Sequence, residues 1–161
     1  MTSQLQAVQS AFLQARRDPG LARALLHQPV TQLAALGIQI PGAADAVVAA
    51  AIFTGAPKAY ELLLNMMNSP QTVDLEPGDY CAACQWLATA FGQAIFAASK
   101  TAAGAPFRGN DPVIVSIARV FGSDPAAVAM AMNNFMAGNP GDSPAALGYA
   151  ICRTAEICCQ G

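Results

Sequence analysis

The sequence has few charged residues. Eight lysines and arginines and ten aspartates and glutamates make up 11% of the 161 residues, and the formal net charge is −2. Proteins that bind nucleic acids neutralise phosphates with clustered basic side chains, and eight scattered ones do not form such a surface. The shortage of charge therefore excludes nucleic acid as a partner. So few surface charges also favour self-association, which predicts a homo-oligomer.

The sequence also lacks the usual marks of an enzyme. It has no glycine-rich phosphate-binding loop and no nucleophile motif. His27 is its one histidine, and no cysteine lies near it in the sequence, so we interpret it as a surface residue. Asp74, Glu76 and Asp79 lie in a polar stretch, whereas a catalytic carboxylate pair needs burial to separate its two pKa values. We predict neither catalysis nor a cofactor.

Long apolar runs are missing as well. The best candidate, Ala46 to Phe53, is about half as long as a bilayer-crossing helix requires. The first residues do not place a basic region before an apolar stretch, as an ordinary secretory signal does. The sequence therefore predicts no membrane-spanning helix and no ordinary export signal.

Apolar residues recur instead at steps of three and four, which is the spacing of amphipathic helices. This spacing, with proline and glycine as boundaries, predicts helices over residues 4–17, 21–36 (broken at Pro29), 43–53, 59–67, 80–100, 112–121, 125–135 and 144–158. No segment alternates with a period of two, so the predicted fold class is all-α.

Residues 69–79 combine two prolines, a glycine and three acidic residues with little apolar content, which is typical of a linker. This stretch divides the predicted helices into two groups. We therefore predict an N-terminal helical segment at residues 1–68, a linker at 69–79 and a helical domain at 80–161.

The five cysteines lie at the two ends of this predicted domain: Cys81, Cys84, Cys152, Cys158 and Cys159. Residues three apart on a helix share a face, so the first two can approach one neighbour. Clustering at both ends favours disulfides and a secreted protein, although four cysteines allow three pairings. The alternative is a cytoplasmic protein in which all five cysteines bind zinc or copper(I) as thiolates.

A Cys-x-x-Cys that opens an amphipathic helix, about 67 intervening residues and a closing Cys-x5-Cys together resemble the saposin-like family. Members of that family are small helical domains that bind or perturb lipids. The resemblance covers roughly half of the chain and implies disulfides Cys81–Cys158 and Cys84–Cys152. It also implies that lipid or a membrane surface is the partner, with antimicrobial or toxin-like action as one outcome.

The residues that would face lipid in such a domain are apolar and lie at helical spacing. They are Trp86, Phe91, Ile95, Ile114, Phe121, Met132 and Phe135. The alternative for each of them is packing in an ordinary core, since such stripes usually face one.

Residues 18–41 carry Asp18-Pro19, an apolar helix, a second proline, and then Leu-Gly-Ile and Pro41. This pattern resembles the leader segment of bacterial exported or modified peptides related to the nitrile hydratase alpha chain. It implies recognition by processing or export machinery. Two hypotheses follow from the sequence: an exported lipid-interacting saposin-like precursor, or a cytoplasmic metal-binding or modified-peptide precursor protein.

Overall fold

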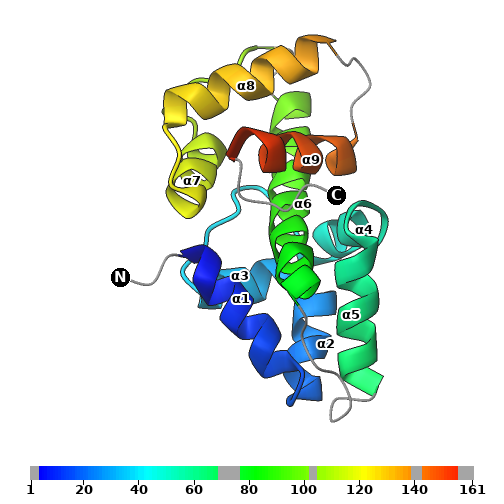
Figure 1. The fold of residues 1–161 in the computed structure, drawn as a ribbon. Coiled ribbons are helices and arrows are strands. Elements are labelled where there is room, and N and C mark those ends of the chain that lie inside the picture. The colour runs from blue at the N-terminus through cyan, green and yellow to red at the C-terminus, as the bar shows by residue number, and fades with distance from the viewer. Residues whose placement is uncertain (1–3, 69–76, 102–104, 139–142, 156–161) are drawn as a thin grey trace.

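The computed structural model describes residues 4–68, 77–101, 105–138 and 143–155. Within these ranges all regular secondary structure is helical, which confirms the predicted all-α class (Figure 1). The helices are α1 (Gln4–Ala15), α2 (Pro19–His27), α3 (Pro29–Ala35), α4 (Asp45–Gly55), α5 (Pro57–Asn68), α6 (Pro77–Thr101), α7 (Pro112–Phe121), α8 (Pro125–Gly138) and α9 (Pro144–Ala155).

Proline and glycine set most of the helix boundaries. Seven of the helices in the described ranges begin with proline, whose fixed φ suits the first helical position and whose missing N–H is not needed there. Gly37 and Gly122, with φ of 83° and 68°, follow α3 and α7 in the left-handed conformation that commonly ends a helix. These signals explain why the predicted boundaries lie close to the observed ones.

The 25-residue helix α6 passes through the centre of the molecule (Figure 1). It contacts α1, α4, α5, α7 and α9, and its most extensive contact is with α9. Between Ala82 and Ile95 every residue is buried except Gln85 and Gln93, which are half-buried. A helix that is apolar on all sides needs neighbours on all sides, and the other helices supply them.

One hydrophobic cluster extends from Val8 in α1 to Ile151 in α9. The predicted division at residues 69–79 therefore does not separate two cores, because α6 buries part of its surface on α1, α4 and α5. Residues 69–76 of the predicted linker lie outside the described ranges, and residues 77–79 form the first turn of α6.

The leader-like residues 18–41 form α2, α3 and the loop that follows them. Their side chains enter the common core, where Leu25, Leu26, Leu33 and Ile38 are buried. The Oδ1 atom of Asp18 caps α2 by accepting hydrogen bonds from the amides of Gly20 (3.1 Å) and Leu21 (3.2 Å). This segment is therefore a packed part of the fold in this structure.

Asp45, the first residue of α4, caps a different helix, α3. Its carboxylate accepts hydrogen bonds from the amides of Val30 (2.8 Å) and Thr31 (3.0 Å) and from the Thr31 hydroxyl (2.6 Å). Burial opposes the charged carboxylate, but the three hydrogen bonds outweigh it and hold the pKa of Asp45 below its usual value. The cap thereby connects two consecutive helices.

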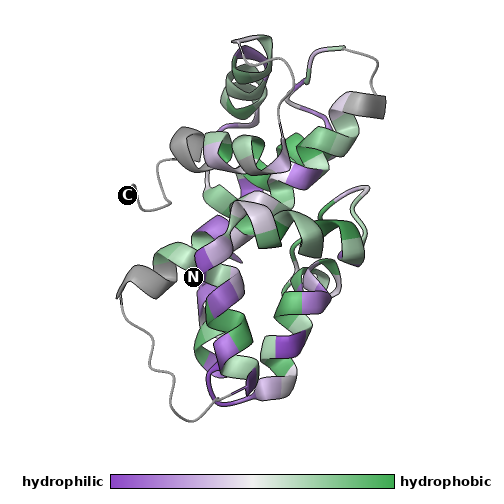
Figure 2. Cartoon of the chain, turned by 90° about the vertical axis from the view of Figure 1, so that its right-hand side faces the viewer, coloured by the Kyte–Doolittle hydropathy of each residue, from purple (hydrophilic) through white to green (hydrophobic). Residues whose placement is uncertain are grey.

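Hydrophilic residues are unevenly distributed over the helices. Figure 2 shows the larger hydrophilic stretches at the bottom of the view, where the helices of the N-terminal half lie. The helices at the top of the view, from the C-terminal half, are more hydrophobic. The two ends of the molecule therefore differ in polarity.

Candidate functional site

Within α6, the stretch Cys81–Ser99 has the length and apolar composition of a membrane-crossing helix, and 72% of it is buried by the rest of the protein. The sequence prediction that no such helix exists is wrong for α6. Thr89 and Gln93 interrupt any strictly apolar run, but the stretch as a whole remains apolar. Two further helix pairs, α4 with α5 and α7 with α8, have the composition of a span but are bent by 111° and 114°.

The structure brings the seven predicted lipid-facing residues into the core. Trp86, Phe91, Ile95, Ile114, Phe121 and Met132 are buried, and Phe135 is partly buried against them. The rings of Phe91 and Phe121 pack edge to face with centroids 6.1 Å apart, which joins α6 to α7. In this conformation these residues pack the interior and do not form a lipid-facing surface.

Trp86 is fully buried, and its indole N–H has no hydrogen-bond partner in the part of the chain that the structure describes. Its ring meets the Phe12 ring edge to face, with centroids 5.5 Å apart. A buried donor without an acceptor costs about 1–3 kcal/mol relative to a satisfied one. The centre of α6 therefore carries an unsatisfied polar group inside an otherwise apolar core.

Cys84 is a buried free thiol. It does not form the predicted bond to Cys152 in this structure, because its side chain faces α1, where Nε2 of Gln9 lies 4.0 Å from Sγ. Burial raises the pKa of the Cys84 thiol, and the contact with Gln9 opposes this only in part. Cys84 is thus held as a neutral thiol, which is a poor metal ligand.

Cys81 is half-buried, whereas Cys84 is buried. It is seven residues before Ala88 and eleven before Gly92, so these three residues share the face that packs on α9. Cys81 is disulfide-bonded, and its partner lies outside the side chains that the structure describes. The predicted Cys81–Cys158 pairing remains a prediction, because Cys158, Cys159 and the Cys152 side chain are not described.

The alternative metal site is not assembled by the described residues. None of their histidine, cysteine, aspartate and glutamate side chains form a group of three that could hold an ion. The structure does not describe the side chains of three of the five predicted ligands, Cys152, Cys158 and Cys159. The metal site therefore stays a prediction.

Two glycines allow α6 and α9 to touch through their backbones. A Cβ atom on Gly148 would lie 2.9 Å from the Cα of Thr89, and one on Gly92 would collide with the Pro144 carbonyl oxygen. The start of α9 thus lies at Gly92 and its middle at Thr89, so α6 and α9 run antiparallel. No side chain larger than hydrogen fits at either position.

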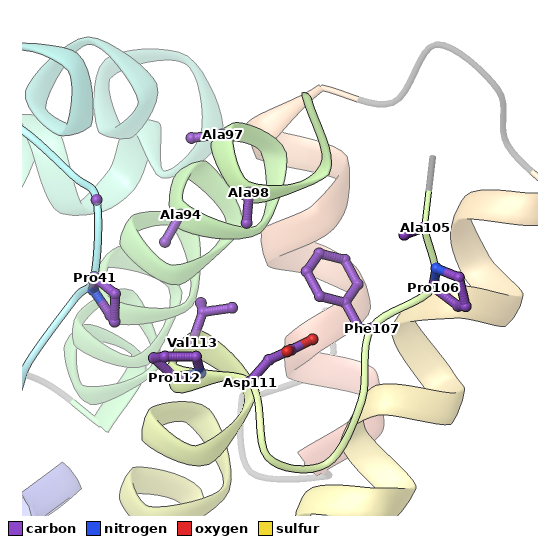
Figure 3. Close-up of a pocket in the computed structure, with 11 residues that line it drawn as sticks. Pro41, Ala94, Ala97, Ala98, Ala105, Pro106, Phe107, Asp111, Pro112 and Val113 are labelled. Atoms are coloured by element: carbon purple, nitrogen blue, oxygen red, sulfur yellow. The ribbon is translucent and has the colours of Figure 1, made fainter. Parts of the chain in front are cut away.

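A pocket of about 340 Å³ lies beside the C-terminal half of α6 (Figure 3). Its walls come from α6, the start of α7, the loop before α4 and the loop before α7. They are formed by Pro41, Gly42, Ala94, Ala97, Ala98, Ala105, Pro106, Phe107, Asp111, Pro112 and Val113. Ala94, Phe107 and Val113 are buried, whereas Gly42, Pro106 and Pro112 are exposed. The pocket thus has an apolar floor and opens at the surface.

Among the described residues that line this pocket, Asp111 is the one with a charged side chain. Asp111 occupies the N-cap position of α7, but its side chain makes no capping bond there. Oδ2 accepts a hydrogen bond from the Arg108 amide at 2.8 Å instead. Figure 3 shows the carboxylate extending from the start of α7 towards Phe107.

Asn133 of α8 holds the wall that carries Phe107. Its Oδ1 accepts a hydrogen bond from the Phe107 amide at 2.8 Å, and its Nδ2 donates to the Phe107 carbonyl oxygen at 2.9 Å. Both backbone groups of Phe107 are therefore bound by one side chain. This pair of bonds places the aromatic ring against α6 without regular secondary structure in the loop.

No family model matches the chain, and no curated protein or solved structure matches it. The two resemblances therefore stand on the residues that carry them.

Sequence reasoning missed the pocket and the close contact of α6 with α9. Gly92 and Gly148 inside predicted helices were the available signal for the contact, because glycine in a helix interior is unfavourable unless packing requires it. The pocket had no comparable signal, since alanine and proline line it from segments more than fifty residues apart.

Proposed function

We propose that the protein binds lipid surfaces, and that it does so by moving its outer helices away from α6. The observation that carries this proposal is an apolar stretch of membrane-spanning length, Cys81–Ser99, which the folded protein keeps covered in water. Transfer of such a stretch from a protein interior to lipid exchanges one apolar environment for another. The hydrophobic stabilisation of α6 is therefore not lost when lipid replaces the covering helices.

Trp86 adds a second reason. Its indole N–H is unsatisfied by the described residues of the closed form. Tryptophan is enriched at membrane interfaces, where the ring contacts acyl chains and the N–H reaches water or a lipid headgroup. A move of Trp86 from the core to an interface would give this donor an acceptor.

The first contact with lipid is expected at α4. Of the large apolar side chains exposed in the described ranges, Val47 and Phe53 belong to α4, with exposed fractions of 48% and 59%. Tyr149 of the adjacent helix α9 is 63% exposed. These residues offer an apolar surface before α6 is uncovered, and the low net charge of −2 keeps repulsion from anionic lipid weak.

Trp86 is the one tryptophan of the chain, so its fluorescence tests the proposal directly. The full chain is mixed with phosphatidylcholine vesicles, with and without anionic lipid, that carry a brominated quencher at one acyl-chain depth. We expect the vesicles to bind the protein and to quench Trp86, while acrylamide in water quenches it little before lipid is added. Absence of vesicle binding at neutral and acidic pH would overturn the proposal.

A matched pair of variants separates surface contact from uncovering. Phe53→Gln should weaken vesicle binding about tenfold, since about 1.5 kcal/mol of lost apolar burial corresponds to one decade in affinity. Leu13→Gln, which alters an exposed residue of α1, should leave binding unchanged. Vesicle binding without quenching of Trp86 would show that lipid contacts only the surface and that α6 stays covered.

A further inference from the structure

We propose that the pocket between α6 and α7 binds a small primary amine that carries an apolar tail, with the Asp111 carboxylate pairing its ammonium group. The pocket shares Ala94, Ala97 and Ala98 with the covered stretch of α6, but its ligand would bind from water to the closed form of the protein. Three features support the proposal: the size and lining of the pocket, the charge at its wall and the rigid placement of its aromatic residue.

The size and lining select an apolar group. A volume of about 340 Å³ is at the lower end of the range for small-molecule sites, so an unbranched tail of about eight carbons is a suitable probe. The floor is made of Ala94, Val113 and the ring of Phe107, all of which are buried. An apolar tail would therefore pack mainly against carbon atoms.

The charge at the wall selects the head of the ligand. A ligand that covers Asp111 removes water from the carboxylate, which is unfavourable unless the ligand compensates the charge. An ammonium group does so with charge-assisted hydrogen bonds, whereas an alcohol does so weakly and a carboxylate adds repulsion. The amide of Arg108 uses only part of the accepting capacity of Asp111, because an ionised carboxylate accepts about four hydrogen bonds.

Nothing described in the structure neutralises this carboxylate. Among the described side chains, no lysine, arginine or histidine forms an ion pair with Asp111. The Arg108 side chain is exposed, although its backbone amide binds Oδ2. The carboxylate therefore remains available to a cationic ligand.

The placement of Phe107 makes the pocket a preformed site. Asn133 binds both backbone groups of Phe107, so the ring does not depend on a ligand for its position. A preformed wall lowers the conformational cost of binding. An aromatic ring close to Asp111 also favours a cation over a neutral group of the same size (Figure 3).

Nuclear magnetic resonance of the full chain, without vesicles, tests the proposal. Octylamine, octanol and octanoate are titrated against the ¹⁵N-labelled protein, and the shifts of backbone amides are followed. Octylamine should shift the amides of Ala98, Phe107 and Val113 and should bind at least tenfold more tightly than octanol, with no binding of octanoate. Equal affinities for octylamine and octanol, shifts confined to other amides, or no shifts would each overturn the proposal.

Two variants assign the roles within the pocket. Asp111→Asn keeps an oxygen for the Arg108 amide and should reduce octylamine binding to the level of octanol. Ala98→Phe should fill the pocket and abolish binding of both, whereas Ala34→Phe on the exposed side of α3 should leave binding unchanged. If Ala98→Phe does not fold, Asp111→Asn decides the question alone. A negative result leaves the vesicle experiment unaffected, so the two proposals fail separately.

Discussion

The two sides of α6 are packed in different ways. On the side that faces the N-terminal helices, α1 contacts α6 through large rings, with Phe12 packed against Trp86. On the side that faces the C-terminal helix α9, the two backbones are in contact at Gly92 of α6 and Gly148 of α9. Large side chains contribute buried apolar area, whereas backbone contact leaves no room for a methyl group. The position of α9 is therefore limited by steric exclusion, and that of α1 is stabilised mainly by the hydrophobic effect.

The comparison also bears on the predicted helical domain at residues 80–161, because α6 packs on helices from both halves of the chain. Residues 80–161 are predicted from the sequence to fold as a domain, yet α6 buries Trp86 on a helix from the N-terminal half. Removal of that half would expose one side of an apolar helix to water. Exposed apolar area of this extent is unfavourable in a soluble protein and promotes aggregation.

The largest effect is expected when the chain is shortened to begin at α6. A fragment of residues 77–161 should fail to fold cooperatively or should aggregate, because α6 has lost the helices that cover its N-terminal side. Circular dichroism during urea titration measures this, with the full chain as the control. A sharp, two-state unfolding transition of the soluble fragment would contradict the comparison and restore the predicted domain.

The second largest effect is expected at the aromatic contact. Phe12→Ala should lower the free energy of unfolding by about 3–5 kcal/mol, because it leaves a cavity beside Trp86. Leu13→Ala is the matched control, since Leu13 is the next residue of the same helix but 40% exposed, and it should cost less than about 1 kcal/mol. Urea unfolding measures both, and equal losses would show that this side of α6 does not depend on Phe12.

Much of the fold follows from local sequence signals. Pro29 and Gly37 mark the limits of α3, and Pro112 and Gly122 mark those of α7, because proline suits a first helical position and glycine a left-handed end. These preferences act within a few residues and need no knowledge of distant contacts. The all-α class and most helix boundaries were predictable for that reason.

The arrangement of the helices was less predictable, because it depends on contacts between distant residues. Cys84 illustrates this: its spacing from Cys81 allows one shared face, yet the packing turns it towards Gln9 of α1. Asp45 lies in the first turn of α4, where an acidic residue usually stabilises its own helix, but its carboxylate caps α3 instead. Sequence spacing limits which residues can meet within one helix, but the packing of neighbours selects the partner in another.

The backbone contact predicts a smaller effect than the aromatic one. Gly148→Ala should lower the free energy of unfolding by about 1–3 kcal/mol, because the added methyl group must displace the backbone of α6 at Thr89. It should also make Trp86 more accessible to acrylamide. Chemical unfolding and fluorescence quenching measure the two effects.

Gly138→Ala is the control for this substitution. Gly138 ends α8, and a Cβ atom there would meet no other atom within 4 Å. Alanine is also the better helix former, so this variant should be as stable as the natural protein or slightly more stable. If both glycine variants behave alike, the contact between α6 and α9 does not restrict side-chain size, and the distinction between the two sides of α6 is lost.

The smallest effect is expected at Asp45, which connects α3 to α4 away from α6. Asp45→Asn should cost about 1 kcal/mol at neutral pH, the usual value for a helix cap. The pKa of Asp45 is lowered in the folded protein, so its charge stabilises the folded state fully above the ordinary aspartate pKa near 3.9. This stabilisation is lost as the pH falls through the pKa of the folded state. In urea unfolding, the difference in free energy of unfolding between Asp45→Asn and the natural protein should therefore shrink below about pH 4. The control, Glu61→Gln on the exposed side of α5, should have little effect at any pH. A difference that stays constant down to about pH 2 would show that the hydrogen-bonding shape of Asp45, and not its charge, connects the two helices.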